Sequence, residues 1–225
     1  MPKHHKQWTK SAKALCLSRA SINTKDGLKP GSEVVQGQHL LYKVYWPRLI
    51  APARVDVRKM GFENEFRAAS EWMSEYGPFQ AYLTSLEAGS AITAHSDYDD
   101  HDLGIFEVAR SQQLQLLHAD GARDADEDTV NSGLMSLLAA LTIKHQPPIG
   151  EWMVQRLRLT ATFRKAGFTT RIDGYLRSHR DRQVEMLVEV KARARRFEEP
   201  DVSMQETSEI IAWLKTTGLE RASNR

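Results

Sequence analysis

The chain has 225 residues and a formal charge of +2, with 41% hydrophobic and 27% charged residues, which is ordinary for a folded globular protein. A single cysteine, Cys16, excludes an internal disulfide framework and predicts a reducing, intracellular location in the nucleus or the cytoplasm. No stretch reaches the roughly 18 apolar residues of a membrane span, so no membrane partner is expected.

Residues 1–38 are expected to form a basic, flexible segment. No acid precedes Asp26, although the same stretch contains several cations. Helix and strand breakers interrupt the region, namely Gly27, Pro30, Gly31 and Gly37. A transit peptide would also be basic and acid-free, so a mitochondrial location stays open, but Arg19 is the only arginine here and a flexible tail is favoured.

Residues 39–124 are assigned to a mainly helical region packed on the core. Their first stretch, 39–46, alternates loosely and predicts a strand that Pro47 stops. Apolar residues at helical spacing predict a helix over 62–76, whose aromatic stripe around Trp72 is most simply core. A second helix is predicted over 103–118.

The loop AHSDYDDHDLG between these two helices is rich in potential metal ligands, namely His95, Asp97, Asp99, Asp100, His101 and Asp102. Their spacing matches no metal-binding template. An EF-hand loop, for example, requires a glycine at its sixth position and a closing glutamate, and this loop has neither. A solvated loop is therefore favoured over a metal site.

Residues 125–225 show a helix, three strands and a helix. Capping residues at 126–129 precede an apolar helical pattern that ends before Pro147. The period then changes to two over 153–163, 168–178 and 183–192, and the short connections predict an antiparallel meander. A helical pattern resumes over 204–218, with Gly218 as its expected cap.

The third strand contains two charged residues on one face. Side chains alternate along a strand, so Glu189 and Lys191 point the same way. Burying either charge costs several kcal/mol, on the order known for ions removed from water. A salt bridge on a solvent-facing edge strand and a functional pair are both compatible with this stretch alone.

Asp173, on the middle strand, favours the functional interpretation. The meander can bring it across from Glu189 and Lys191. Two carboxylates provide the oxygen ligands that Mg²⁺ or Mn²⁺ prefers, and a lysine supplies a mobile positive charge beside a phosphate. Phosphodiester hydrolysis requires these groups.

The pattern resembles the fungal PD-(D/E)XK nuclease-like family of the PD-(D/E)XK nuclease superfamily. The resemblance is carried by DEDTVNSGLMSLLAAL, RIDGYLRS, LVEVKARARR and MQETSEIIAWL, which span roughly residues 125–217. It implies an α/β, restriction-endonuclease-like core in which helices flank a mixed β-sheet. The position of the proline in the superfamily's name is occupied here by Ile172.

The resemblance also implies roles for individual residues. Asp173 and Glu189 would hold Mg²⁺ or Mn²⁺ with the Val190 carbonyl, and Lys191 would act at the scissile phosphate. Three further positions match polar residues near the active site of some members, namely Gln205 on the last helix and Glu127 or Asn131 on the first. Glu127 is included among the expected metal ligands, although its place in a helix cap already explains it.

Arginine side chains along the meander and its exit predict a nucleic-acid partner, DNA rather than RNA. The candidates for phosphate contact are Arg171, Arg177, Arg193, Arg195 and Arg196. Phosphate neutralisation supplies most sequence-independent affinity, and the guanidinium fork suits phosphate. A solvated strand face is the alternative.

The sequence leaves little chain after the last helix for the further strand that superfamily members dock beside the ExK strand. Residues 39–46 could fill that place, a second copy could cover the edge as a homodimer, or the protein could be a shortened and poorly active relative. Three functions follow: a metal-dependent DNA endonuclease, an inactive nucleic-acid-binding relative, and a protein-interaction module.

Overall fold

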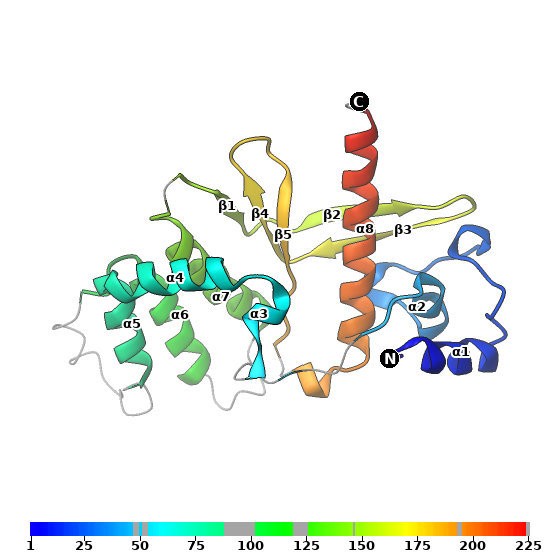
Figure 1. The fold of residues 1–225 in the computed structure, drawn as a ribbon, viewed down its shortest axis with the longest axis horizontal. Coiled ribbons are helices and arrows are strands. Elements are labelled where there is room, and N and C mark those ends of the chain that lie inside the picture. The colour runs from blue at the N-terminus through cyan, green and yellow to red at the C-terminus, as the bar shows by residue number, and fades with distance from the viewer. Residues whose placement is uncertain are drawn as a thin grey trace. The chain divides into compact units, whose positions relative to one another are not determined.

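The computed structural model describes residues 1–46, 50, 54–87, 102–118, 126–145, 147–192 and 195–223. The chain is α/β and forms two compact units (Figure 1). The sheet unit combines Met1–Arg48 with Gly150–Arg225, and the helical unit is Leu49–Ile149. This division differs from the expected boundaries, since the N-terminal segment belongs with the strands and the helix that follows residue 126 belongs to the helical unit.

The helical unit is built from short amphipathic helices. They are α3 (Val57–Met60), α4 (Glu63–Glu75), α5 (Gly77–Glu87), the 3₁₀ turn η5 (Gly104–Phe106), α6 (Glu107–His118) and α7 (Glu127–Thr142). Tyr82, Leu103, Phe106 and Ala140 form its buried core. The predicted helices over 62–76 and after residue 126 are confirmed, with starts within one or two residues of those predicted. The helix predicted over 103–118 is confirmed from Glu107 onward, and the 3₁₀ turn η5 precedes it.

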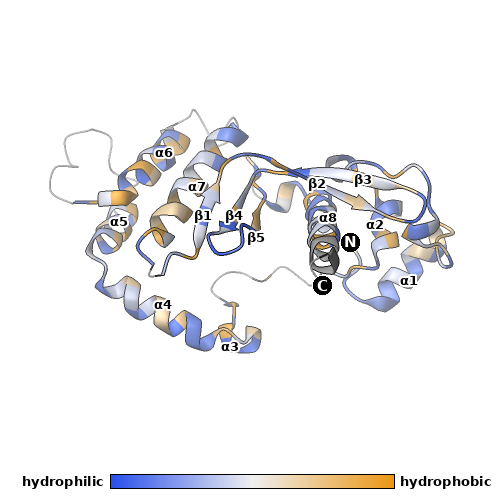
Figure 2. Cartoon of the chain, turned by 90° about the horizontal axis from the view of Figure 1, so that it is seen from above, coloured by the Kyte–Doolittle hydropathy of each residue, from blue (hydrophilic) through white to orange (hydrophobic). Residues whose placement is uncertain are grey.

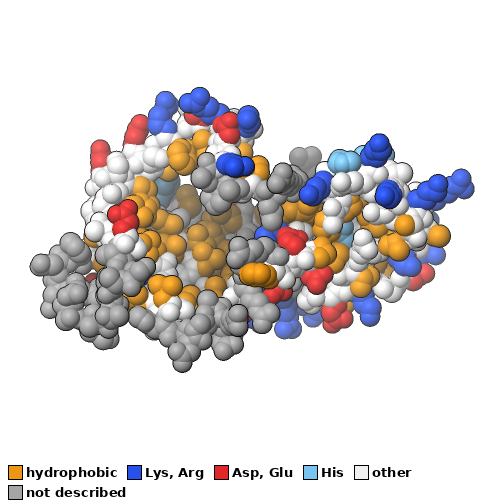
Figure 3. Space-filling model, turned by 90° about the horizontal axis from the view of Figure 1, so that it is seen from below, with side chains coloured by type: hydrophobic (Ala, Val, Ile, Leu, Met, Phe, Trp, Pro, Cys, Tyr) orange, Lys and Arg blue, Asp and Glu red, His pale blue; other side chains and the backbone are white. Residues whose placement is uncertain are grey.

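Most of the aromatic stripe of α4 is exposed, which corrects the prediction that it is core, although Tyr76 at its end packs against the buried core of the helical unit. Phe62 and Phe66 are 59% and 58% exposed, and Trp72 is 37% exposed. Helical spacing shows that these residues share a face, but it does not show whether that face has a partner. Hydrophobic side chains also reach the surface of this unit in Figure 3.

The N-terminal segment is folded rather than flexible. It forms α1 (His5–Ala14), the 3₁₀ turns η1 (Ile22–Thr24) and η2 (Gly31–Glu33), and α2 (Gln36–Tyr42). Trp8, Ala12 and Leu40 are buried together, and the Trp8 indole N–H donates a 2.8 Å hydrogen bond to the Leu40 carbonyl. Burial of a large aromatic residue whose N–H is hydrogen-bonded stabilises the segment and offsets the entropy cost of ordering it. The basic composition alone suggested that this entropy cost would dominate.

The strand predicted over 39–46 is wrong, because α2 occupies its first residues. Four consecutive residues, 38–41, are buried. Leu40 packs on Trp8, whereas the Tyr42 hydroxyl accepts a 3.3 Å hydrogen bond from Ser208. A helix can bury residues in two directions at once, which a strand with one buried face cannot do.

The meander is present, but two of its three strands are interrupted. The strands of the described residues are β1 (Gly150–Met153), β2 (Leu157–Thr162), β3 (Gly167–Ile172), β4 (Gly174–Ser178) and β5 (Val184–Val188). They form one sheet in the order β1-β4-β5 and a second hairpin of β2 and β3. All described pairs are antiparallel, so the expected mixed sheet is not found in the part of the chain that the structure describes.

The helix α8 (Asp201–Ser223) packs across β2 and β3, as Figures 1 and 2 both show. Leu159, Ala161, Phe168 and Ile172 are buried against Ala212. Each large apolar side chain in this layer stabilises the fold by about 1.5–3 kcal/mol. The helix continues through Gly218, so this glycine is not the predicted cap.

The strand β5 lies at the edge of its sheet. It pairs with β4, with a register of Gly174 to Val188, and no other described strand pairs with it. Because residues 39–42 are helical, the expected repair by that segment is wrong. A second copy on this edge remains a prediction, and so does the shortened-relative alternative. No helix among the described residues is long and apolar enough to cross a membrane.

Candidate active site

Asp173 lies at the break between β3 and β4. Continuing the register of β4 with β5 places it opposite Glu189, since Gly174 pairs with Val188. Its backbone N–H donates a 3.1 Å hydrogen bond to the Val188 carbonyl, and its Oδ2 accepts a 3.0 Å bond from the Val190 N–H. The strand break therefore places the Asp173 carboxylate against the segment that contains Glu189 and Lys191. Asp173 is buried, with only 8% of the residue exposed.

Glu189 and Lys191 lie beyond the end of β5, because this strand is shorter than the predicted strand 183–192. Their side chains meet, with 2.5 Å between Lys191 Nζ and Glu189 Oε1. The Glu189 side chain is 8% exposed and that of Lys191 is 25% exposed. The alternative of a solvent-facing edge salt bridge is therefore wrong, because the carboxylate is buried.

The helix α8 contributes Gln205 and Glu209 to the same cluster. Gln205 Nε2 donates to Glu189 Oε1 at 2.5 Å and to Glu209 Oε1 at 2.9 Å. Positions four residues apart share a helix face, so the two side chains project together. The sequence prediction included Gln205 and missed Glu209; the available signal was an acid four residues after Gln205, on the same face of the helix.

Burial raises the pKa of two of these carboxyl groups. The pKa of Glu189 rises to about 8, first because the group is buried and then because Glu209 is negatively charged nearby, while Lys191 opposes the rise. Burial likewise raises the pKa of Glu209 to about 7, against the hydrogen bond from Gln205 and the charge of Lys191. At neutral pH the cluster therefore retains a proton in the absence of a cation.

The residues present fit a hard divalent cation. Asp173, Glu189 and the Val190 carbonyl offer only oxygen donors, and Glu189 Oε2 is buried without a hydrogen-bond partner. Arg156 Nε lies 3.5 Å from Asp173 Oδ1. Within the described residues, no three His, Cys, Asp or Glu side chains are already arranged as ligands of one metal ion.

The remaining predicted ligand residues lie elsewhere in the chain. Glu127 is in the first turn of α7, and Asn131 is buried one turn later, so both belong to the helical unit. A role for Glu127 in metal binding stays a prediction. Of the acidic loop, residues 88–101 lie outside the described residues, and Asp102 Oδ1 accepts a 3.0 Å hydrogen bond from the Gly104 N–H.

Two of the predicted phosphate-binding arginines are engaged within the fold. Arg177 is hydrogen-bonded to Glu151, which Arg182 also contacts at 2.9 Å. Arg195 contacts Glu199 at 2.7 Å and Glu206 at 2.5 Å. Its guanidinium also stacks over the Trp46 ring at 5.2 Å.

Arg171 is exposed on β3. Arg193 and the side chain of Arg196 lie outside what the structure describes. Phosphate contact by these three residues, and by Arg177 and Arg195, stays a prediction.

Comparisons of this chain with protein-family models, with curated proteins and with solved structures find no match.

Proposed function

We propose that the protein is a divalent-metal-dependent nuclease that hydrolyses phosphodiester bonds in DNA through Asp173, Glu189 and Lys191. The observation that carries the proposal is the 3.0 Å hydrogen bond from the Val190 N–H to Asp173 Oδ2, which joins the predicted acid to the predicted ExK segment. The two are 17 residues apart in sequence. A structural salt bridge alone would not require a second buried carboxylate opposite the first.

The arrangement of the sheet unit supports a restriction-endonuclease-like core. An antiparallel β4–β5 pair leads into the Glu189-Val190-Lys191 segment, and α8 follows it, as the resemblance implies. The helix returns Gln205 to Glu189. The expected order of acid, ExK segment and helix is thus consistent with these contacts.

Asp173, Glu189 and the Val190 carbonyl would hold Mg²⁺ or Mn²⁺. When bound, such an ion supplies positive charge at phosphate oxygens and lowers the pKa of a bound water. Lys191 has a partly exposed side chain, so its ammonium can contact the phosphate and stabilise negative charge that develops there. Gln205 fixes the position of the Glu189 carboxylate through its hydrogen bond.

A plasmid-nicking assay tests this function. Wild type should nick supercoiled DNA in Mn²⁺ and not in EDTA, and Lys191→Ala should nick at least about a hundredfold more slowly because a general electrostatic contribution of this kind is worth that much. Lys165→Ala, which removes an exposed lysine of the β2–β3 turn, is the matched control. Absence of nicking by wild type, or equal rates for wild type and Lys191→Ala, would contradict the proposal.

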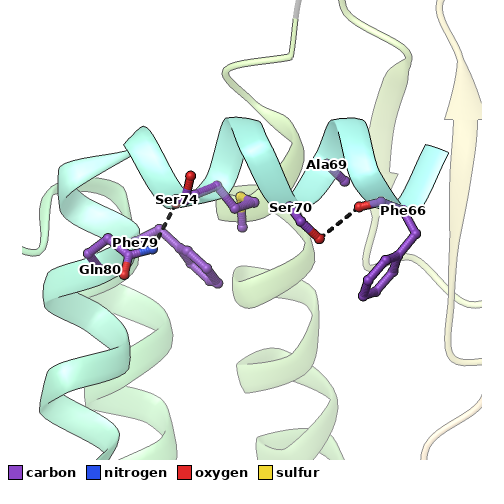
Figure 4. A pocket seen from close by; sticks show the side chains of 7 residues that line it. Phe66, Ala69, Ser70, Ser74, Phe79 and Gln80 are labelled. Carbon is purple, nitrogen blue, oxygen red and sulfur yellow. Dashed lines mark hydrogen bonds between the residues drawn. The ribbon is translucent and has the colours of Figure 1, made fainter. Parts of the chain in front are cut away.

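A second candidate function, binding of a protein partner, is favoured by the exposed face of α4. A cavity of about 340 Å³ is lined by residues of α4 and of the start of α5, namely Phe66, Ala69, Ser70, Met73 and Ser74 on α4 and Phe79 and Gln80 on α5. Figure 4 shows Phe66 of α4 and Phe79 of α5 on the same side of α4. Exposed apolar patches of this kind mark interaction sites.

The charge of α4 indicates the class of partner. Its four glutamates, Glu63, Glu65, Glu71 and Glu75, outnumber its one arginine, Arg67, so a basic amphipathic helix is the complementary ligand. Wild type should bind a Leu/Lys model helix and not a Leu/Glu helix, and Phe66→Ser should weaken that binding. Equal binding of both helices would contradict this candidate function.

A further inference from the structure

We propose that Glu209 is a third carboxylate of the same cation site, a role that rests on the proposed function of Asp173 and Glu189. Two observations point to it. Glu209 is 2% exposed, although it lies on a helix with ample solvent-facing positions. Glu189, its neighbour in the cluster, has a buried oxygen, Oε2, without a hydrogen-bond partner.

The Gln205 amide contacts an oxygen of each of the two glutamates. Its Nε2 is 2.5 Å from Glu189 Oε1 and 2.9 Å from Glu209 Oε1. One nitrogen donor is thus shared by oxygens of two carboxylates, and the Lys191 ammonium adds a second donor on Glu189. Without metal, these donors therefore occupy carboxylate lone pairs that a cation would use.

The acidic side chains of the cluster favour binding of a divalent cation. Asp173, Glu189 and Glu209 are three acids, and the cations in contact with them include Lys191 and Arg156. Burial of an uncompensated carboxylate is costly unless a proton or a metal neutralises it. Hard oxygen ligands with a net negative charge are the chemistry that Mg²⁺, Mn²⁺ and Ca²⁺ select.

Tb³⁺, an oxygen-preferring luminescent cation, is the probe for the test. Its luminescence lifetime in H₂O and D₂O reports how many water molecules remain bound to it, so loss of a coordinating carboxylate adds bound water. Glu209→Gln should lower the Tb³⁺ affinity of the full chain by about tenfold or more and raise the bound-water number. Competition with Mn²⁺ should show the same loss of affinity.

Asp201→Asn is the matched control, because it removes an exposed acid from the first turn of the same helix. It should leave both readouts unchanged. A Glu209→Gln variant with weaker affinity but an unchanged water number would overturn coordination, since the effect would then be one of charge alone. Unchanged affinity would overturn the proposal as well.

Asp173→Asn separates this inference from the function on which it rests. If Asp173→Asn loses Tb³⁺ affinity while Glu209→Gln does not, the inference about Glu209 is wrong and the proposed function stands. If Glu209→Gln loses affinity and Asp173→Asn does not, Glu209 binds a cation but the nuclease site is wrong. If wild type binds no Tb³⁺ and no Mn²⁺, both are wrong.

Discussion

Glu189 and Glu209 bury two carboxyl groups in one cluster, joined by the single amide nitrogen of Gln205. The two residues lie on different elements, since Glu189 follows β5 and Glu209 is on α8. The fold thus brings together two acids that repel when ionised, and the charge of Glu209 raises the pKa of Glu189. Stability in the absence of metal should depend on their protonation.

Without metal, the free energy of unfolding should fall as the pH rises from about 4.5 to about 8. Both acids titrate near 4.5 when unperturbed, whereas the folded protein retains their protons until about 7 for Glu209 and about 8 for Glu189. The folded state then binds more protons than the unfolded state, so stability is lost as pH increases through this window.

Glu209→Gln should reduce that loss, because it removes the charge that repels Glu189. We expect the variant to match wild type near pH 4.5 and to be more stable at pH 8.5 by on the order of 1–2 kcal/mol. Urea unfolding in EDTA, followed by circular dichroism at both pH values, measures the difference. A difference that is the same at both pH values would show that the pKa shifts of the cluster do not govern it.

Gly31 is predicted to be intolerant of a side chain. A Cβ there would lie 2.4 Å from Thr170 Oγ1 and 2.6 Å from Thr170 Cβ, so Gly31→Ala should destabilise the sheet unit by about 1–3 kcal/mol. Gly37→Ala is the control within the same unit, since its nearest neighbour would be Leu17 Cδ1 at 3.8 Å. Alanine favours a helix, so Gly37→Ala should be neutral or stabilising by up to about 1 kcal/mol. Equal effects on urea unfolding would contradict this packing.

Local patterns predicted the elements whose apolar residues follow a single period. The helices α4, α6 and α7 and the antiparallel order of the three strand segments are examples. The interruption at Asp173 was not predictable, because a continuous strand and a strand broken at one residue show nearly the same alternation. The end of β5 before Glu189 was not predictable for the same reason.

Burial that depends on distant partners was also missed. The N-terminal segment is ordered because Trp8 contacts Leu40, which is 32 residues away in sequence. Neither the composition nor the spacing of apolar residues predicts such a contact. Glu209 was overlooked because an acid on a helix is usually solvated, and only its proximity to Glu189 gives it a candidate role. Strand pairing predicted that Asp173 would lie across from Glu189 and Lys191, and the resemblance implied that Gln205 would be near them; the structure brings these side chains together, and their catalytic role stays a prediction.

The single-turnover rate of DNA cleavage by Asp173→Asn tests the proposed nuclease most directly. With protein in excess and Mn²⁺ present, the rate reports chemistry rather than affinity, and Asp201→Asn provides a control for loss of an acid elsewhere. The account predicts that Asp173→Asn cleaves at least about a hundredfold more slowly than wild type while binding DNA as well or more tightly, because a negative charge near phosphate is removed. Cleavage by Asp173→Asn at the wild-type rate would contradict it.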